Sequence, residues 1–403
     1  MTYADFLREQ CYIDGQWCDA DSGETVDVTD PGKGVRLGCV PAMGQAETAR
    51  AIAAAPAALP GWRARTAADR ATLLRRLFDL MMVNQDALGE LLTREQGKPL
   101  AEAKGEIAYA AGFVEWFAEE GKRAYGEVVP SHAADKRIVV LKQGVGVVGA
   151  ITPWNFPTAM VTRKLAPALA AGCTIVIKPA SATPYSALAL GVLAEQAGIP
   201  AGVINIVTGS ARAIGGELTA NPLVRKISFT GSTETGRALL RACADTVKKT
   251  SMELGGNAPF LVFDDADIDA AVEGAMASKF RNNGQTCICT NRFYVQDGVY
   301  DAFVAKLVGK VKALKVGYGL DDGTAVGPLI DDKAVEKVEE HVADAIEGGG
   351  TLLTGGRRSS LGGFYYEPTV IADVAPNMKL AQEETFGPLA GVIRFADEAQ
   401  PIR

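Results

Sequence analysis

The chain has 403 residues, of which 48% are hydrophobic and 22% are charged, and its formal net charge is −7. This composition is typical of a soluble globular protein with two or three domains. It contains no Lys/Arg-rich run that would favour nucleic acid as a partner, and no apolar run near the ~18 residues of a transmembrane helix.

The N-terminal sequence MTYADFLREQCYIDGQW does not have the pattern of a secretory signal, because no basic segment precedes an apolar one. We therefore expect a cytoplasmic protein whose thiols are reduced. The chain has seven cysteines, and this odd number also argues against a disulfide framework.

The first third of the chain is predicted to be mainly helical. The Ala/Pro-rich segment Arg50–Trp62 predicts a helix followed by a turn. Leucines and methionines recur at helical spacing through Ala67–Glu95, and Gly97 and Pro99 are expected to end that helix. A second long helix is predicted over Ala101–Arg123.

Residues Lys136–Ile151, KRIVVLKQGVGVVGAI, change in character and predict two β-strands that are separated at Gln143 and Gly144. The stretch Gly144–Gly149 matches the pattern G-x-G-x-x-G. A dinucleotide-binding fingerprint follows a strand and opens a helix, whereas this stretch lies within strand-like sequence. We therefore interpret it as ordinary strand sequence.

From about Met160 onward, helices and strands alternate. Such alternation predicts a parallel sheet that is covered by helices on both faces and binds ligands beyond the carboxyl ends of its strands. The predicted pairs are helix Ala159–Ala171 with strand CTIVIKP, Ser186–Ala197 with VINIVTG, Ile214–Asn221 with RKISFTG, and Thr235–Ala244 with KKTSMEL.

A second alternation begins after Gly256, with the strand PFLVF and the helix Ile268–Asn283, and it predicts a second α/β domain. This helix leads into FRNNGQTCICTN, which holds Cys287 and Cys289. A zinc site needs about four ligands, and the only two histidines, His132 and His341, are distant in sequence. We therefore expect no metal.

A structural disulfide between Cys287 and Cys289 would be strained, and the cytosol would reduce it. A nucleophilic cysteine is the interpretation that is left. Because histidines are so few, its activation is expected to come from backbone donors, a helix dipole or a neighbouring cation.

Two segments place groups suited to a nucleotide at predicted strand ends. In FTGSTETG, Gly231 and Ser232 separate a strand from a helix, an arrangement that favours a phosphate and is equally typical of an ordinary helix cap. Lys178 ends the strand CTIVIKP. It could bond a ribose or a phosphate, or it could be a solvated lysine.

Two further residues suit acyl chemistry. Glu253, before Gly255 and Gly256, could be a general base or a capping residue, and Asn155 in WNFP could donate to an oxyanion, although asparagine is also common in turns. Together with Cys287 they suggest one reaction without a histidine: a thiolate adds to a carbonyl, a nicotinamide accepts hydride, and water hydrolyses the thioester.

Six segments in this order resemble the aldehyde dehydrogenase superfamily, and the likeness runs through nearly the whole chain. It is especially strong to the bacterial succinate-semialdehyde dehydrogenases that prefer NADP. The segments are ITPWNFP (151–157), TIVIKPAS (174–181), SFTGSTETG (228–236), MELGGNAPFLVFDDADID (252–269), RNNGQTCICTNRFYVQ (281–296) and EETFGP (383–388).

The resemblance implies a role for each matching residue. Cys287 would be the nucleophile, Glu253 the base for water, and the Asn155 side chain with the Cys287 backbone N–H the oxyanion hole. The NADP site would be lined by Trp154, Asn155, Lys178, Pro179, Ala180, Ser181, Gly231, Ser232, Leu254 and Glu384, with Phe386 packed nearby.

Ser181 bears on the choice of cofactor. NAD-selective relatives often have a glutamate there, which bonds the adenosine 2′-hydroxyl and would repel a 2′-phosphate. Because Ser181 is neutral and Lys178 is close in sequence, we expect a preference for NADP over NAD, with NAD possible.

Arg163 and Arg281 lie eight residues after Asn155 and six before Cys287. The resemblance implies that they bind the far carboxylate of succinate semialdehyde, which accepts bidentate bonds, and surface ion pairing is the ordinary alternative. Glutarate semialdehyde could also fit, because one methylene discriminates by only about 1–3 kcal/mol.

The resemblance has two more implications for the cysteines and the assembly. Cys289 is similar to a second cysteine of succinate-semialdehyde enzymes, which implies a reversible Cys287–Cys289 disulfide that switches activity off. The strand pair Lys136–Val148 resembles the arm through which these enzymes form dimers and tetramers, although a plain surface hairpin would read the same way. A homotetramer in 4-aminobutyrate degradation is implied.

The implied fold is α/β. It has a Rossmann-type parallel-sheet NADP-binding domain at 1–122 and 142–252, an oligomerisation β-arm at 123–141, and a second α/β catalytic domain at 253–403. In the family the catalytic domain continues well past EETFGP, so we expect a C-terminally truncated chain with exposed apolar surface.

Three alternative functions stay open on the sequence alone. The chain could be a dehydrogenase for another aldehyde. It could be a cysteine acyltransferase or hydrolase, because thioester chemistry needs only Cys287, Asn155 and Glu253. It could also be a non-catalytic fragment that assembles through its β-arm.

Overall fold

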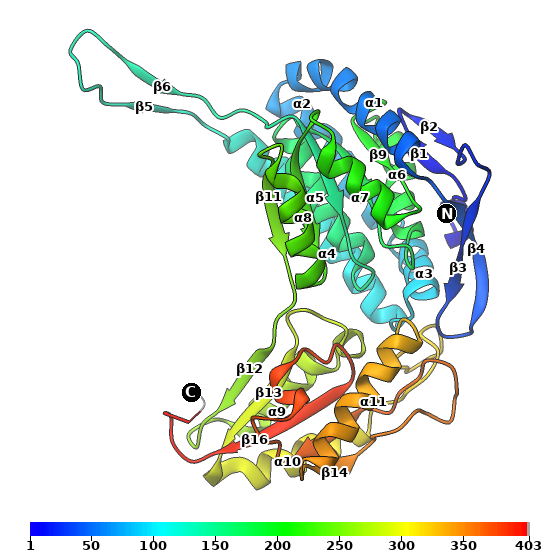
Figure 1. Cartoon of the computed structure of the whole chain (residues 1–403), viewed down its shortest axis with the longest axis vertical. Helices are drawn as coiled ribbons and strands as arrows, with labels where there is room; N and C mark the ends of the chain where they lie inside the picture. The colour runs from blue at the N-terminus through cyan, green and yellow to red at the C-terminus, as the bar shows by residue number, and fades with distance from the viewer. Residues whose placement is uncertain (401–403) are drawn as a thin grey trace. The chain divides into compact units, whose positions relative to one another are not determined.

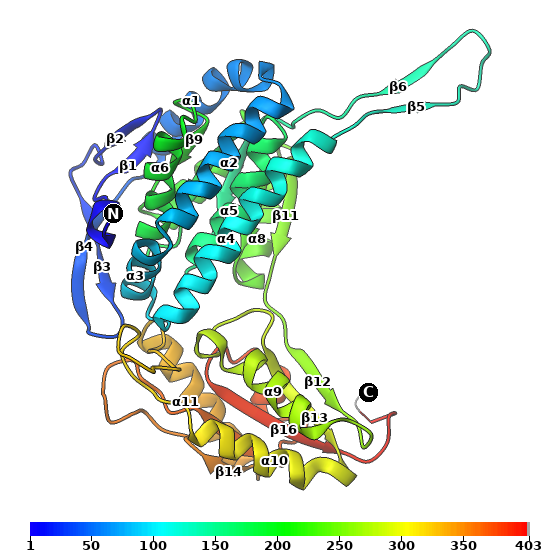
Figure 2. The same ribbon diagram turned by 180° about the vertical axis from the view of Figure 1, so that it is seen from behind.

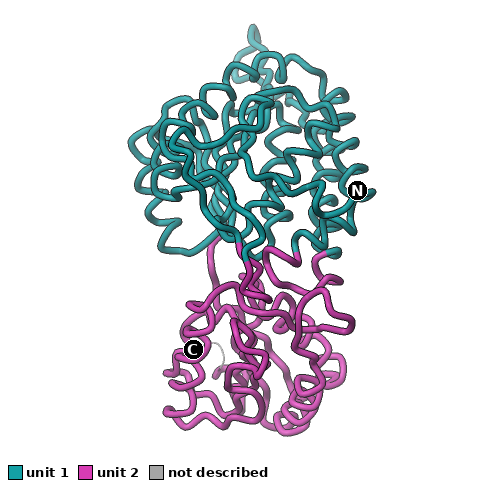
Figure 3. Tube along the Cα trace, turned by 90° about the vertical axis from the view of Figure 1, so that its right-hand side faces the viewer, with its two compact units in different colours: residues 1–28, 36–92, 104–253 teal, residues 29–35, 93–103, 254–403 magenta. Residues whose placement is uncertain are grey.

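A computed structural model describes residues 1–400, which form two compact units (Figure 3). Unit 1 comprises Met1–Val28, Arg36–Leu92 and Lys104–Glu253, and unit 2 comprises Thr29–Val35, Thr93–Ala103 and Leu254–Arg403. No helix among residues 1–400 has the length and apolar character that crossing a membrane requires.

Unit 1 is built on a seven-stranded sheet with the order β11-β10-β7-β8-β9-β1-β2 (Figure 1). The first five of these strands are parallel, as the alternating pattern predicted, and most of their residues are buried, as in a sheet covered on both faces. They are β7 (Val147–Ile151), β8 (Thr174–Lys178), β9 (Ile204–Ile206), β10 (Val224–Thr230) and β11 (Lys249–Glu253); β1 (Cys11–Ile13) and β2 (Gln16–Cys18) extend the sheet in antiparallel fashion.

Helices cover both faces of this sheet. Helix α1 packs against α7, whereas α2 packs against α5 and α6 on the opposite face (Figures 1 and 2). The helices are α1 (Gln45–Ala64), α2 (Ala67–Val83), α3 (Gln85–Gln96), α4 (Leu100–Glu120), α5 (Pro157–Ala170), α6 (Tyr185–Ala197), α7 (Ala211–Ala220) and α8 (Thr233–Ala244). The remaining N-terminal elements are η1 (Tyr3–Phe6), β3 (Thr25–Asp30), β4 (Val35–Pro41) and η2 (Gly121–Arg123).

Two helix predictions in this region are wrong in detail. The single helix expected over Ala67–Glu95 is two helices, because Asn84 leaves the helical conformation and its side chain donates to the Leu80 carbonyl at 2.8 Å. The turn expected within Arg50–Trp62 is absent. Helix α1 continues through both of its prolines, and the indole of Trp62 anchors it by donating to the Leu169 carbonyl at 3.1 Å.

A hairpin lies within 123–141, the range expected for the β-arm, but its strand pairing differs from the predicted one. β5 (Glu127–Val129) pairs antiparallel with β6 (Ile138–Val140), and this hairpin stands away from the rest of unit 1 (Figure 1). The predicted pairing within Lys136–Val148 is wrong, because β7 is a buried central strand between β8 and β10. An exposed strand and a buried strand that follow each other closely in sequence had been taken as a pair.

Unit 2 contains a five-stranded sheet with the order β12-β13-β16-β15-β14, in which only β14 is antiparallel. This confirms the second α/β fold. The strands are β12 (Ala258–Val262), β13 (Thr290–Gln296), β14 (Thr351–Thr354), β15 (Thr369–Ala372) and β16 (Leu389–Phe395), and the helices are α9 (Ile268–Lys279), η3 (Arg281–Gly284), α10 (Asp297–Lys312), α11 (Asp332–Glu347) and α12 (Lys379–Gln382).

Candidate active site

The predicted site residues of unit 1 gather at one edge of its sheet. Met252, Phe229, Ile151 and Lys178 form one paired row across β11, β10, β7 and β8, and the pair of Thr230 with Glu253 lies one residue further along. Because the four strands are parallel, the segments that follow them leave the sheet at the same edge. Asn155, Ser181 and Gly231 lie in these segments.

Lys178 is a buried cation at this edge. Its Nζ donates to the Ser181 hydroxyl at 3.3 Å, and burial lowers the pKa of its ammonium to about 8. No ion pair with a carboxylate is formed by Lys178 within residues 1–400. The lysine and the serine that the sequence assigned to the cofactor therefore contact each other.

The segment after β10 has the geometry of a helix start. Ser232 caps α8, since its Oγ accepts a hydrogen bond from the Thr235 N–H at 3.3 Å. Gly231 cannot be larger, because a Cβ there would lie 2.5 Å from the ring of Phe229. The N-terminus of this twelve-residue helix favours an anion.

Asn155 lies in the loop between β7 and α5 and is buried, whereas Trp154 beside it is half-buried. The helix that follows is fixed from outside the loop, since the Glu106 carboxylate accepts from the N–H groups of Thr158 and Ala159 at 3.0 and 3.2 Å. This acidic cap on the first turn of α5 holds the loop at its far end. The sequence analysis did not find Glu106.

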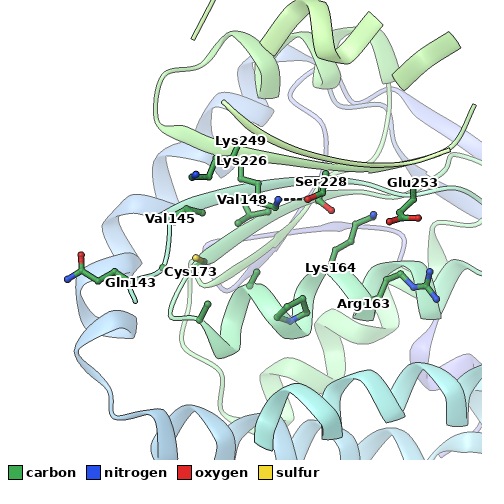
Figure 4. Close-up of a pocket in the computed structure, with 15 residues that line it drawn as sticks. Gln143, Val145, Val148, Arg163, Lys164, Cys173, Lys226, Ser228, Lys249 and Glu253 are labelled. Carbon is green, nitrogen blue, oxygen red and sulfur yellow. Dashed lines mark hydrogen bonds between the residues drawn. The ribbon is translucent and has the colours of Figure 1, made fainter. Parts of the chain in front are cut away.

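A pocket of about 570 Å³ opens beside α5, β10 and β11 (Figure 4). Glu253 is the one acid among its lining residues, and Arg163, Lys164, Lys226 and Lys249 are four cations. The Lys164 amine and the Glu253 carboxylate lie close together in Figure 4. The pocket therefore favours an anionic ligand.

Lys164 was missed by the sequence analysis. It is buried, its Nζ donates to the Thr230 hydroxyl at 2.7 Å, and burial together with the charge of Arg163 lowers the pKa of its ammonium to about 8. Its apolar sequence context carried no signal, because charged side chains are seldom buried.

In unit 2, Cys287 lies on a segment that we call the cysteine loop, residues 281–289. Asn282 and Asn283 have φ of 50° and 57°, a left-handed conformation that costs free energy and must be held by its surroundings. The predicted helix Ile268–Asn283 ends at Lys279 for this reason. Cys287 is half-buried, and Arg281 at the start of the loop is exposed.

Buried amide side chains hold the cysteine loop. Asn282 donates its N–H to Glu102 at 2.7 Å and accepts from Gln96 at 3.0 Å. Asn283 donates to the Gly327 carbonyl at 2.9 Å, and Gln285 accepts from the Ile330 N–H at 3.0 Å. Together these hydrogen bonds fix the conformation of the backbone that precedes Cys287.

The segment EETFGP packs on the cysteine loop. A Cβ on Gly284 would lie 2.1 Å from the Gly387 carbonyl oxygen, and a Cβ on Gly255 would lie 2.6 Å from the Glu384 carboxylate. Burial raises the pKa of Glu384, and its bond to the Gly256 backbone opposes this. Within unit 2, Glu384 thus lies next to the glycines that follow Leu254. Phe386 belongs to the same segment, which packs on the cysteine loop.

Cys289 has a different environment from Cys287. It is buried, its Sγ donates to the Gly284 carbonyl at 3.4 Å, and the Nζ of Lys279 lies 3.8 Å away. Lys279 is wholly buried, donates to Asn291 at 3.1 Å, and has its pKa lowered by that burial. The sequence analysis missed Lys279. No disulfide forms among the cysteines, and residues 1–400 contain no cluster of three or more potential metal ligands.

Comparisons with known proteins were made for the whole chain. The profile described as "Aldehyde dehydrogenase family" matches residues 17–403. The chain is 64% identical to the glutarate-semialdehyde dehydrogenase of Pseudomonas aeruginosa and 63% identical to the NADP(+) succinate-semialdehyde dehydrogenase GabD of Escherichia coli. Each match covers 99% of this chain and 83% of the relative. A crystal structure of an E. coli NADP-dependent enzyme, 63% identical over 99% of this chain and 83% of its own, superposes with a TM-score of 0.98.

Proposed function

The chain belongs to the aldehyde dehydrogenase family, and we propose that it oxidises a short semialdehyde with a terminal carboxylate, succinate semialdehyde in the first place, with NADP as oxidant. The proposal is supported by the sheet edge of unit 1, where Glu253 and Lys178 end parallel strands and the segments with Asn155 and Ser181 leave the sheet. We also propose that unit 1 is the cofactor domain and unit 2 the catalytic domain.

The residues of the edge fit NADP. Lys178 is a buried cation without a carboxylate partner in residues 1–400, and it contacts a neutral hydroxyl, which suits a ligand with hydroxyls and an added phosphate. The N-terminus of α8, which follows Gly231 and is capped by Ser232, favours a phosphate. When bound, NADP supplies the hydride acceptor. The same residues leave NAD possible.

The chain's own residues supply the remaining chemistry. The Cys287 thiolate adds to the aldehyde carbon, and the Asn155 amide with the Cys287 N–H donates to the oxygen that becomes negative. After oxidation the substrate is a thioester of Cys287. Glu253 removes a proton from water, which attacks the thioester and releases the acid and the thiolate. Lys164 and Arg163 keep the surroundings of Glu253 positive.

The substrate class is tested by the rate of NADPH formation with succinate semialdehyde, glutarate semialdehyde and butanal. We expect the two carboxylate substrates to differ in kcat/KM by about 10–200-fold, the range for one methylene. Butanal, which lacks the carboxylate for Arg163 and Arg281, is expected to be the poorest. Equal use of butanal would support a dehydrogenase for another aldehyde instead.

Lys178 gives the proposal a pH signature. Because its pKa is lowered from 10.5 to about 8, the lysine is charged below that pH and loses its charge as pH rises through it. The Kd of NADP, measured by fluorescence titration, is therefore expected to rise about tenfold per pH unit above pH 8. In Lys178→Arg the guanidinium stays charged, so the Kd of NADP should not change with pH over this range. An equal rise of the Kd with pH in the wild type and the variant would contradict the role assigned to Lys178.

We also propose that mild peroxide switches the enzyme off. Peroxide would oxidise the Cys287 thiolate to a sulfenic acid and form water, and the Cys289 thiol would then displace a second water to form the disulfide. Since Cys289 is buried, this step requires the cysteine loop to open. After prolonged peroxide treatment, dithiothreitol is expected to restore the wild type but not Cys289→Ala, in which the unprotected sulfenic acid of Cys287 is oxidised further to the irreversible sulfinic acid. Mass spectrometry that finds no Cys287–Cys289 disulfide would refute the switch.

The hairpin β5–β6 is proposed to join a second copy of the chain in a homo-oligomer. It exposes Val128 by 79%, Val139 by 61% and the adjacent Leu141 by 72%, and its outer edges lack strand partners. Light scattering is expected to show a dimer or tetramer that Val128→Lys with Val139→Lys dissociates. A monomeric wild type would reduce the hairpin to a surface feature.

We also propose a cytoplasmic location, which suits the reduced thiols of this chain.

A further inference from the structure

Arg163 is held in one position by two aromatic side chains of α4. Its Nη2 donates to the Tyr109 hydroxyl at 2.6 Å, and its guanidinium carbon lies 4.8 Å from the centre of the Phe113 ring. The Tyr109 and Phe113 rings meet edge to face, with centres 4.8 Å apart. The guanidinium is thus fixed by a hydrogen bond and by a ring face, both from unit 1.

No carboxylate balances this charge. Arg163 forms no ion pair with any acid within residues 1–400, and its buried Nε has no hydrogen-bond partner there. By contrast, Arg358 bonds both Asp332 and Glu339. A guanidinium has five N–H donors in a fixed fork, so Arg163 keeps donors for an anion while its position is already set.

The two aromatic side chains that hold Arg163 belong to an apolar stripe of α4. A second pocket, of about 370 Å³, is lined by Tyr109, Gly112, Phe113, Trp116 and Phe117 along one stripe of α4. Among these aromatic residues only Tyr109 and Phe113 contact Arg163.

We infer that Tyr109 and Phe113 are positioning residues that set the preference for aldehydes with a far carboxylate by holding Arg163 ready for it. The inference rests on the proposed function, because it assumes that Arg163 binds the substrate carboxylate. Neither residue takes part in bond making. Their effect is confined to how well an anionic substrate or product is bound relative to a neutral one.

The test compares succinate semialdehyde with butanal in Tyr109→Phe, which keeps the ring and removes the hydroxyl. We expect KM for succinate semialdehyde to rise on the order of fivefold, the effect of losing one typical hydrogen bond, with kcat unchanged. The constants for butanal should not change. Phe113→Leu should act in the same direction, and Trp116→Phe, on the same stripe but without a contact to Arg163, should have no effect.

Arg163→Ala separates the inference from the proposed function. If it leaves the preference for succinate semialdehyde over butanal unchanged, the carboxylate role of Arg163 in the proposed function is wrong. If it removes the preference and Tyr109→Phe changes nothing, or changes both substrates equally, only the inference on Tyr109 is overturned. In Arg163→Ala, adding Tyr109→Phe should cause no further loss. Titration calorimetry can measure the affinity of the wild type, Tyr109→Phe and Arg163→Ala for the product succinate. This compares the three proteins without turnover.

Discussion

Replacement of Cys287 by alanine is expected to abolish NADPH formation from succinate semialdehyde, with a loss of about 10⁵-fold or more, as when other nucleophilic enzymes lose their nucleophile. Cys289, the nearest cysteine in sequence, is buried and donates its thiol to Gly284. Neither a steady-state rate nor a single turnover should be detected by absorbance.

The matched control is Cys289→Ala, which changes the same side chain two residues away. Under reducing conditions it should keep most of the wild-type rate. Both variants should bind NADP as the wild type does, since the residues assigned to the cofactor are intact. Substantial turnover by Cys287→Ala, or equal losses in the two variants, would remove Cys287 from the proposed mechanism.

Glu253→Gln is expected to lower kcat by about 10²–10⁴-fold, the usual contribution of a general base. Glutamine keeps the shape of the side chain, but it cannot take the proton from water. The thioester of Cys287 should therefore form at a normal rate and accumulate. Rapid mixing should show one equivalent of NADPH per active site, followed by a slow steady state.

Hydroxylamine provides the control for this result, because it attacks a thioester without needing a base. Added to Glu253→Gln, it should restore continuous NADPH formation and release the hydroxamate of the acid. If the variant shows no initial burst, Glu253 acts before the thioester is formed, and the role assigned to it is wrong.

The sequence predicted the sheet of unit 1 well because its signal is redundant. Each strand is a short apolar run that follows a helix with its own periodicity, and parallel strands leave little choice of arrangement. The positions of Lys178, Gly231 and Glu253 at strand ends follow from this pattern alone. Their appearance at one edge needed only the rule that parallel strands share a direction.

The wrong strand pairing predicted within Lys136–Val148 shows what such patterns lack. The sequences of β6 and β7 are both rich in valine. The neighbouring residues do not indicate that β6 is exposed and β7 is a central strand. Pairing is decided by distant segments: β5 for the arm, and β8 and β10 for the core. Helix α1 was misjudged for a related reason, since its buried face and the Trp62 anchor outweigh two prolines.

The buried cations could not be found from sequence. Lys164 and Lys279 stand among apolar residues in helices, where a lysine ordinarily reaches solvent with its charged end. Their hydroxyl, thiol and amide partners, such as Thr230 and Asn291, come from other parts of the fold. The contact of Tyr109 with Arg163 likewise joins two helices that are separated in sequence by the whole β-arm.

The anchors of the cysteine loop have a consequence for how this enzyme can change. Its bonds to Gln96, Glu102, Gly327 and Ile330 all lie within unit 2, whereas Tyr109, Phe113 and Arg163 belong to unit 1. Mutations that retune the recognition of the acid group are therefore expected to leave the nucleophile undisturbed. A chain built in this way can acquire a new aldehyde during evolution by a few helix substitutions, without first losing its reactivity.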